Sequence, residues 1–191
     1  MSLVLELSEK FKKNISHNVK LSNYSWFNLG GPAEHLFKPK SKDQLIQFIK
    51  MNKKNNLYIT ILGAGSNTLI RDNGVKGAVI KLGSNFSNIN LVDKNTIEVG
   101  GATLDRKIAN FAKENKIGNL EFLSCIPGSI GGAVIMNSGC YGNDISKILY
   151  SINVIDIKSG QEKEIKRKDI EFFYRGTNLP NHLIIISVKL R

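Results

Sequence analysis

Two glycine-rich segments are the parts of this 191-residue sequence whose residue types and spacing could do chemistry. The first follows an apolar run at residues 57–62 and consists of Gly63, Ala64, Gly65, Ser66, Asn67 and Thr68. Because glycine lacks a Cβ, backbone N–H groups can converge on an anion there, and Ser and Asn side chains add donors. The segment matches neither the GxGxxG pattern nor a P-loop. It predicts a phosphate-binding turn of another kind, with an ordinary turn as the alternative.

The second segment carries no charged residue and consists of Pro127, Gly128, Ser129, Ile130, Gly131, Gly132 and Ala133. An exposed loop normally carries Lys, Glu or Asp, so a glycine-rich segment without charge indicates backbone packed tightly against something. We expect its N–H groups to be available to a ligand. It then forms a second wall of the same cofactor site, with purely structural packing as the alternative.

Other candidates for chemistry are few. Tyr174 and Arg175 follow a run of Glu and Phe, and an Arg in such a place is more often engaged in a surface salt bridge than in catalysis. Cys125 and Cys140 form no CxxC pair and have no His nearby, so we expect two reduced structural thiols, and no zinc spacing exists. The sequence also offers no Ser-His-Asp order and no paired-carboxylate site.

The formal charge of +11 makes an anionic partner the first class to consider. The Lys and Arg residues fall into separate clusters without interleaved aromatics, so we expect solvated surface and no nucleic-acid partner. No stretch approaches the roughly 20 consecutive apolar residues of a membrane span, and residues 1–18 lack a secretory h-region. A cytoplasmic protein with no membrane partner is the expectation.

The first turn needs elements to position it. Residues 3–14 show helical apolar spacing, residues 16–25 are a polar stretch, and a short strand is expected near residues 36–39. Ser41 is a good N-cap for a helix over 42–55, and residues 57–62 are expected to form a buried strand. These pieces make a βαβ unit that ends in the first turn.

The second half has a different pattern of elements. Strands are expected at 78–81, 89–91, 96–99, 149–157, 160–165 and 182–190, with a hairpin turn at residues 158–160. A helix is expected from 103 or 104 to about 115, ended by Gly118. The fold class is therefore α+β, with a small α/β lobe at 1–80 and an α+β lobe at 81–191.

Four ordered motifs resemble one known family. They lie at residues 28–33, 62–72, 120–142 and 172–175, and their order and spacing are similar to those of UDP-N-acetylenolpyruvoylglucosamine reductase, which acts in peptidoglycan precursor synthesis. The resemblance runs from about residue 20 to the C-terminus. Thr177, Cys125 and Ser138 depart from the family's usual residues.

The resemblance implies the two-lobed FAD-binding fold of vanillyl-alcohol-oxidase-type flavoenzymes. It implies that residues 63–68 and 127–133 contact FAD, and that NADPH delivers hydride through the flavin to the enolpyruvyl group of a UDP-sugar substrate. Arg175 matches the catalytic arginine, whose cationic fork suits charge developing on the substrate carboxylate. Tyr174 is expected at the flavin or substrate edge.

In the family a third, substrate-binding domain follows the strand at 182–190 and supplies a proton-donating serine and a glutamate. This sequence ends at Arg191, so we expect an FAD-binding portion that does not complete the reaction alone. A separate chain or a further segment would supply the substrate-binding domain. The alternatives are another flavin oxidase of the same fold, with covalent FAD on a Cys or His, and a non-catalytic binding module.

Overall fold

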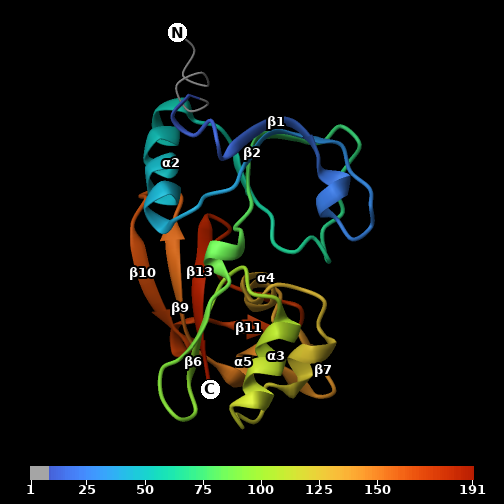
Figure 1. Ribbon diagram of the computed structural model, residues 1–191, viewed down its shortest axis with the longest axis vertical. Helices are drawn as coiled ribbons and strands as arrows, with labels where there is room; N and C mark the ends of the chain where they lie inside the picture. Colours follow the sequence, from blue (N-terminus) through green and yellow to red (C-terminus); the bar gives the residue numbers. More distant parts are fainter. Residues whose placement is uncertain (1–8) are drawn as a thin grey trace. The chain divides into compact units, whose positions relative to one another are not determined.

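The computed structural model describes residues 9–191 (Figure 1). The chain divides into two compact units. The first contains residues up to Gly83 together with Ile157–Gln161, and the second contains Ser84–Asp156 and Glu162–Arg191. The chain thus leaves the first unit after residue 83 and returns to it for five residues.

The first unit is built on a four-stranded sheet in the order β1-β2-β4-β3. Its strands are β1 (Ile15–Lys20), β2 (Pro32–Phe37), β3 (Ile59–Ile61) and β4 (Val75–Ile80). β1 pairs antiparallel with β2, whereas β2 and β3 both run parallel to β4. Helix α2 (Lys42–Asn55) connects β2 to β3, which confirms the expected βαβ unit. The first glycine turn begins where β3 ends.

Helix α2 begins and ends where its sequence indicates. The Ser41 hydroxyl accepts a hydrogen bond from the Gln44 N–H at 3.1 Å, which satisfies one of the free donors of the first turn. Asn56 ends the helix in the left-handed conformation, with φ of 52°. The buried face of the helix adds Phe48 to a ring cluster in which Phe48 stacks on Phe37 at 4.1 Å.

Several expectations for the first unit need correction. Residues 15–20 form strand β1 and residues 21–24 a 3-10 helix, although the segment is polar, because β1 is an edge strand whose side chains are mostly exposed. β3 is only half-buried rather than buried. Of the helix expected over 3–14, residues 3–8 lie outside the described residues, residues 9–10 are helical and residues 11–14 form a turn.

The second unit contains a five-stranded antiparallel sheet in the order β10-β9-β13-β6-β5. Its strands are β5 (Ile89–Leu91), β6 (Ile97–Gly100), β9 (Leu149–Asp156), β10 (Glu162–Lys166) and β13 (Leu183–Leu190). Helices α3 (Asp105–Glu114), α4 (Ile130–Ile135) and α5 (Ile145–Ile148) pack on one face of this sheet (Figure 1). The core between them is aliphatic, with Ile108, Val134, Ile152 and Val188 fully buried.

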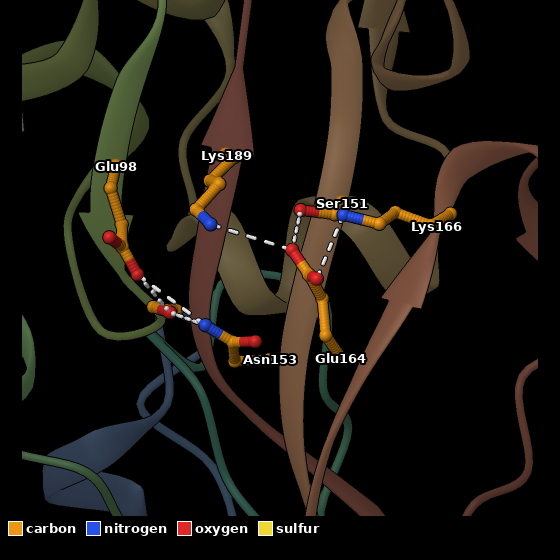
Figure 2. Close-up of polar contacts among 7 residues, drawn as sticks. Glu98, Ser151, Asn153, Glu164, Lys166 and Lys189 are labelled. Carbon is orange, nitrogen blue, oxygen red and sulfur yellow. Dashed lines mark hydrogen bonds and ion pairs between the residues drawn. The ribbon is translucent and has the colours of Figure 1, made fainter. Parts of the chain in front are cut away.

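Figure 2 shows a polar network on the five-stranded sheet. Glu164 of β10 accepts a hydrogen bond from the Ser151 hydroxyl at 2.8 Å and lies 2.8 Å from the Lys166 ammonium. Lys166 and Ser151, opposed by a smaller cost of burial, lower the pKa of Glu164 to about 2. These side chains alternate with core residues along each strand, so the face opposite the helices is polar.

The second unit confirms most of its expected elements. β5 has the expected bounds, and α3, β6, β9 and β13 are within about two residues. Gly118 does not end α3, because Asn115 is its C-cap and Lys116 adopts a φ of 57°. The sequence did not indicate α4, α5 or the short hairpin β7 (Gly139–Cys140) and β8 (Asn143–Asp144). These elements are too short for periodicity to reveal.

Candidate functional site

The first glycine turn packs against the end of the 3-10 helix Leu21–Tyr24 and the residues that follow it. Gly65 has a φ of 76°, and a Cβ added there would lie 1.9 Å from the carbonyl oxygen of Tyr24. The Trp26 N–H donates to the Gly65 carbonyl at 3.0 Å, and the Ser25 hydroxyl donates to the Thr68 carbonyl at 3.3 Å. The turn is therefore fixed by backbone contacts that only glycine permits at residue 65.

The outer edge of this turn is open. Gly63, Asn67 and Thr68 are exposed, and Ser66 is half-buried. Large apolar side chains next to the turn are also exposed, with Trp26 62% and Leu69 73% accessible. Residues 68–71, which follow the turn, are irregular and form no helix. The turn thus presents backbone and short polar side chains beside exposed apolar side chains.

Two lysines that the sequence did not single out lie beside the first turn. The Lys81 ammonium donates to the Gly63 carbonyl, and the Lys38 ammonium donates to the Tyr24 hydroxyl at 2.8 Å. Both ammonium groups flank the Tyr24 ring, at 5.9 and 4.6 Å from its centroid. Burial, and secondarily the positive charge of Lys38, lowers the pKa of Lys81. An anion bound at this edge would relieve the repulsion between the two cations.

The second glycine turn belongs to the other unit and is bound to the start of α3. The Asp105 N–H donates to the Gly128 carbonyl at 3.1 Å, and Leu104 and Ser129 form an antiparallel bridge. The N–H groups of Ile130 and Gly131 donate to carbonyl oxygens of Thr103 and Gly101 at 2.9 and 3.0 Å. These two N–H groups are therefore engaged within the protein and are not available to a ligand, and Pro127 and Gly132 are the exposed residues of the turn.

A buried carboxyl group lies at the start of α3, next to this turn. The side chain of Asp105 is fully buried, and neither carboxyl oxygen has a hydrogen-bond partner among the described residues. Burial raises the pKa of Asp105 to about 7, against an ordinary value of 3.8. Nothing in the sequence distinguishes Asp105 from a surface residue in the first turn of a helix, where Asp is common.

Tyr174 and Arg175 form the two-residue turn between β11 (Phe172–Phe173) and β12 (Gly176–Thr177). Arg175 adopts a φ of 58°, and both side chains are exposed, Tyr174 to 90%. The Asn137 side chain donates to the Phe173 carbonyl at 3.2 Å, and the Thr177 hydroxyl donates to the Ile135 carbonyl at 3.3 Å. The hairpin is thus anchored to the C-terminal end of α4. The N-terminal end of this helix lies in the second glycine turn.

The structure brings Arg175 and the second turn into one unit and leaves the first turn in the other. Among residues 9–191, no three His, Cys, Asp or Glu side chains gather in a way that could hold a metal ion. None of the helices described there has the length and apolar character needed to cross a lipid bilayer.

Comparisons with known proteins show a flavoprotein family to which this chain is similar. A family model described as an FAD binding domain matches residues 33–166. The UDP-N-acetylenolpyruvoylglucosamine reductase of Pelagibacter ubique (strain HTCC1062) is 44% identical over 187 residues, which cover 97% of this chain and 60% of that protein. The chain spans about 60% of the length of such curated relatives.

Solved structures show the same resemblance. The UDP-N-acetylenolpyruvylglucosamine reductase from Thermus caldophilus matches with a TM-score of 0.78 and 29% identity, covering 91% of this chain and 60% of that chain. A VAO-type flavoprotein from Myceliophthora thermophila matches with a TM-score of 0.70 at 11% identity, covering 99% and 46%. These matches confirm the α+β FAD-binding fold of the vanillyl-alcohol-oxidase type.

Proposed function

Because the chain belongs to the FAD binding domain family, we propose that it is the FAD-binding portion of an NADPH-dependent reductase. Its substrate is the enolpyruvyl ether of UDP-N-acetylglucosamine, which is reduced to UDP-N-acetylmuramate in the cytoplasm during peptidoglycan precursor synthesis. The identity of 44% to a protein named for this reaction is the observation that carries the proposal.

The residues of the first turn fit the diphosphate of FAD. The open edge of the turn offers Ser66, Asn67 and Thr68, and glycine at residues 63 and 65 removes the side chains that would block an approach. Burial, and secondarily the charge of Lys38, lowers the pKa of Lys81, and a diphosphate at this edge would offset the repulsion between the two cations. The exposed Trp26 and Leu69 side chains provide apolar area that a bound dinucleotide would cover.

The second turn supplies a further contact surface for the cofactor through exposed Pro127 and Gly132 and half-buried Gly128. Ser129, Ile130 and Ala133, which the sequence also assigned to this contact, are buried. Exposed Gly132 has room for a ligand, since the nearest atom to an added Cβ is the Ser129 hydroxyl at 3.8 Å. When bound, FAD carries hydride from NADPH to the substrate. The protein's part is to hold the cofactor against the substrate.

Arg175 is the residue that acts on the substrate carboxylate in this proposal. Its exposed guanidinium stands on a two-residue turn whose strands are anchored by Asn137 and Thr177. A fixed planar cation stabilises an enolate better than a mobile ammonium does, because its donors match both carboxylate oxygens. Tyr174, beside it, contacts the flavin or substrate edge.

Titration of the purified chain with FAD tests the proposal. We expect a yellow protein, or uptake of added FAD with quenched flavin fluorescence, and slow or absent NADPH oxidation with the UDP-sugar. The substrate-binding segment, with its proton donor, belongs to a further part of the protein or to another chain. A colourless chain that takes up no FAD would defeat the proposal, and acid-stable colour would indicate a covalent flavin oxidase instead.

The role of Arg175 has a separate test. Arg175→Ala should leave FAD binding unchanged, because the guanidinium is exposed and makes no hydrogen bond to either glycine turn among the described residues. The UDP-sugar should perturb the flavin spectrum of the unaltered protein in its full-length form and not that of the variant. Arg175→Lys should restore only part of the perturbation, since it keeps the charge and loses the fork.

A further inference from the structure

The fold brings together two cysteines that the sequence separates by fourteen residues. Cys125 ends the 3-10 helix Glu121–Cys125, and Cys140 ends β7, which packs against that helix. The Cys140 thiol donates to the Phe122 carbonyl at 3.3 Å. Phe122 lies one turn before Cys125 in the same 3-10 helix, so this bond holds the Cys140 sulfur close to Cys125. Both cysteines are free.

The two thiols differ in exposure and surroundings. Cys125 is exposed and lies 3.6 Å from the Ser124 hydroxyl, so a small oxidant can reach it. Cys140 is half-buried and packs against the core of the second unit. Burial, then the neighbouring Cys125, raises the pKa of Cys140, whereas Arg175 opposes this rise. An exposed thiol with a second thiol beside it is the arrangement in which a first oxidation is followed by disulfide formation.

We propose that Cys125 and Cys140 are a redox modification site, at which a peroxide converts the dithiol into an intramolecular disulfide. The Cys125 thiolate attacks the peroxide, the O–O bond breaks, and a sulfenic acid forms on Cys125. The Cys140 sulfur then attacks the Cys125 sulfur, the S–O bond breaks and water leaves. With hydrogen peroxide, two thiols and one peroxide give one disulfide and two waters.

The position of this pair gives the modification a structural effect. A bond between residues 125 and 140 closes a loop over residues 126–139, which include the whole second glycine turn and α4. The disulfide therefore restrains the segment that also anchors the Arg175 hairpin through Asn137. The inference does not depend on FAD binding, because the two thiols meet within one unit.

Peptide mapping of the peroxide-treated chain tests the proposal. Trypsin releases residues 117–147 as one peptide, since no Lys or Arg lies between Lys116 and Lys147, and this peptide contains both cysteines. We expect it to lose two hydrogen atoms and both reactive thiols. The same treatment in guanidinium should form the bond at least about tenfold more slowly, because the fold no longer holds the sulfurs together.

Matched variants complete the experiment. In Cys140→Ser, Cys125 should gain oxygen atoms without losing two hydrogens, and in Cys125→Ser the remaining thiol should react more slowly. Circular dichroism would verify that both variants fold. Three results would overturn the proposal: oxygen added to Cys125 of the unaltered chain while Cys140 stays a free thiol, a disulfide only between two molecules, or an equal rate in guanidinium.

Discussion

The carbonyl oxygen of Tyr24 closes against Gly65, leaving 1.9 Å for any Cβ at that residue. Gly65→Ala must therefore displace either the first turn or the chain at Tyr24, and it also places a side chain at a φ of 76°. The left-handed backbone alone costs about 1–2 kcal/mol. We expect a lower urea midpoint and weaker FAD binding in a fluorescence titration.

The control for this substitution is Gly83→Ala. A Cβ at Gly83 meets nothing within 4 Å, so this variant should keep both the urea midpoint and the affinity for FAD. Unchanged FAD binding by Gly65→Ala, with the control behaving as expected, would show that the first turn does not hold the cofactor.

Two adjacent glycines of the second turn should respond differently to alanine. A Cβ on Gly131 would lie 2.9 Å from the Gly101 carbonyl, whereas one on Gly132 would lie 3.8 Å from its nearest neighbour. Gly131→Ala should lose about 1–3 kcal/mol of stability through this crowding. Gly132→Ala should keep or gain stability, since Ala favours helix by up to about 1 kcal/mol.

The same two substitutions distinguish an effect on stability from an effect on FAD binding. If FAD lies against Gly132, Gly132→Ala should weaken FAD binding with no loss in the urea midpoint. Equal effects of the two substitutions on the midpoint would contradict the packing described for the turn.

Asn137 should control the order of the Arg175 hairpin. Its Nδ2 donates to Phe173, and its Oδ1 accepts from the Ser146 N–H at 3.1 Å. Asn137→Asp keeps the acceptor and loses the donor, so it should cost about 1 kcal/mol, and Asn137→Ala should cost more because it loses both. The specific measurement is amide hydrogen exchange over residues 172–177, which should quicken in both variants. Exchange that stays slow would assign the anchoring to Thr177 instead.

Asp105 should make stability depend on pH in a defined window. Its pKa of about 7 in the folded protein exceeds its ordinary 3.8, so between about pH 4 and 7 the folded chain holds a proton that the unfolded chain has released. Stability contributed by this group therefore decreases as the pH rises through the window. Asp105→Asn cannot ionise, and it should gain roughly 2–4 kcal/mol relative to the unaltered protein on going from pH 4 to pH 8.

Urea unfolding at several pH values measures this difference. His35 works in the opposite direction, because burial lowers its pKa and its contribution grows as the pH rises towards 6.5. The comparison of variant with unaltered protein removes the contribution of His35. Asp169→Asn, at an exposed position, should leave the profile unchanged. Parallel profiles for Asp105→Asn and the unaltered protein would contradict the assignment.

Local signals in the sequence located the longer elements well. Ser41 marks the start of α2 because a hydroxyl before an apolar stripe caps a helix, and the α3 stripe is equally regular. Strand β1 was missed because an edge strand with exposed side chains lacks the apolar alternation that marks buried strands. The short α4 was missed since six residues show less than two helical turns.

Some features of the candidate site could likewise be predicted from the sequence, and others could not. Glycine turns and the Tyr174–Arg175 pair are visible in the sequence, because their residue types are unusual in place. The contacts of Lys81, the burial of Asp105 and the packing of Cys140 against the helix that carries Cys125 are tertiary. No local pattern distinguishes these residues from surface lysines, helix-start aspartates or structural thiols.

Because residues 157–161 belong to the first unit, neither compact unit is a single continuous segment of the chain. The Ser159 carbonyl accepts a hydrogen bond from Lys53 at 3.2 Å, and Gly160 lies against Lys50. A protease that cuts after Gly83 would thus leave two fragments still joined through this β9–β10 turn. A chain cut to residues 1–83 would lack residues 157–161 of the first unit, whereas residues 84–191 would contain the whole second unit together with that turn.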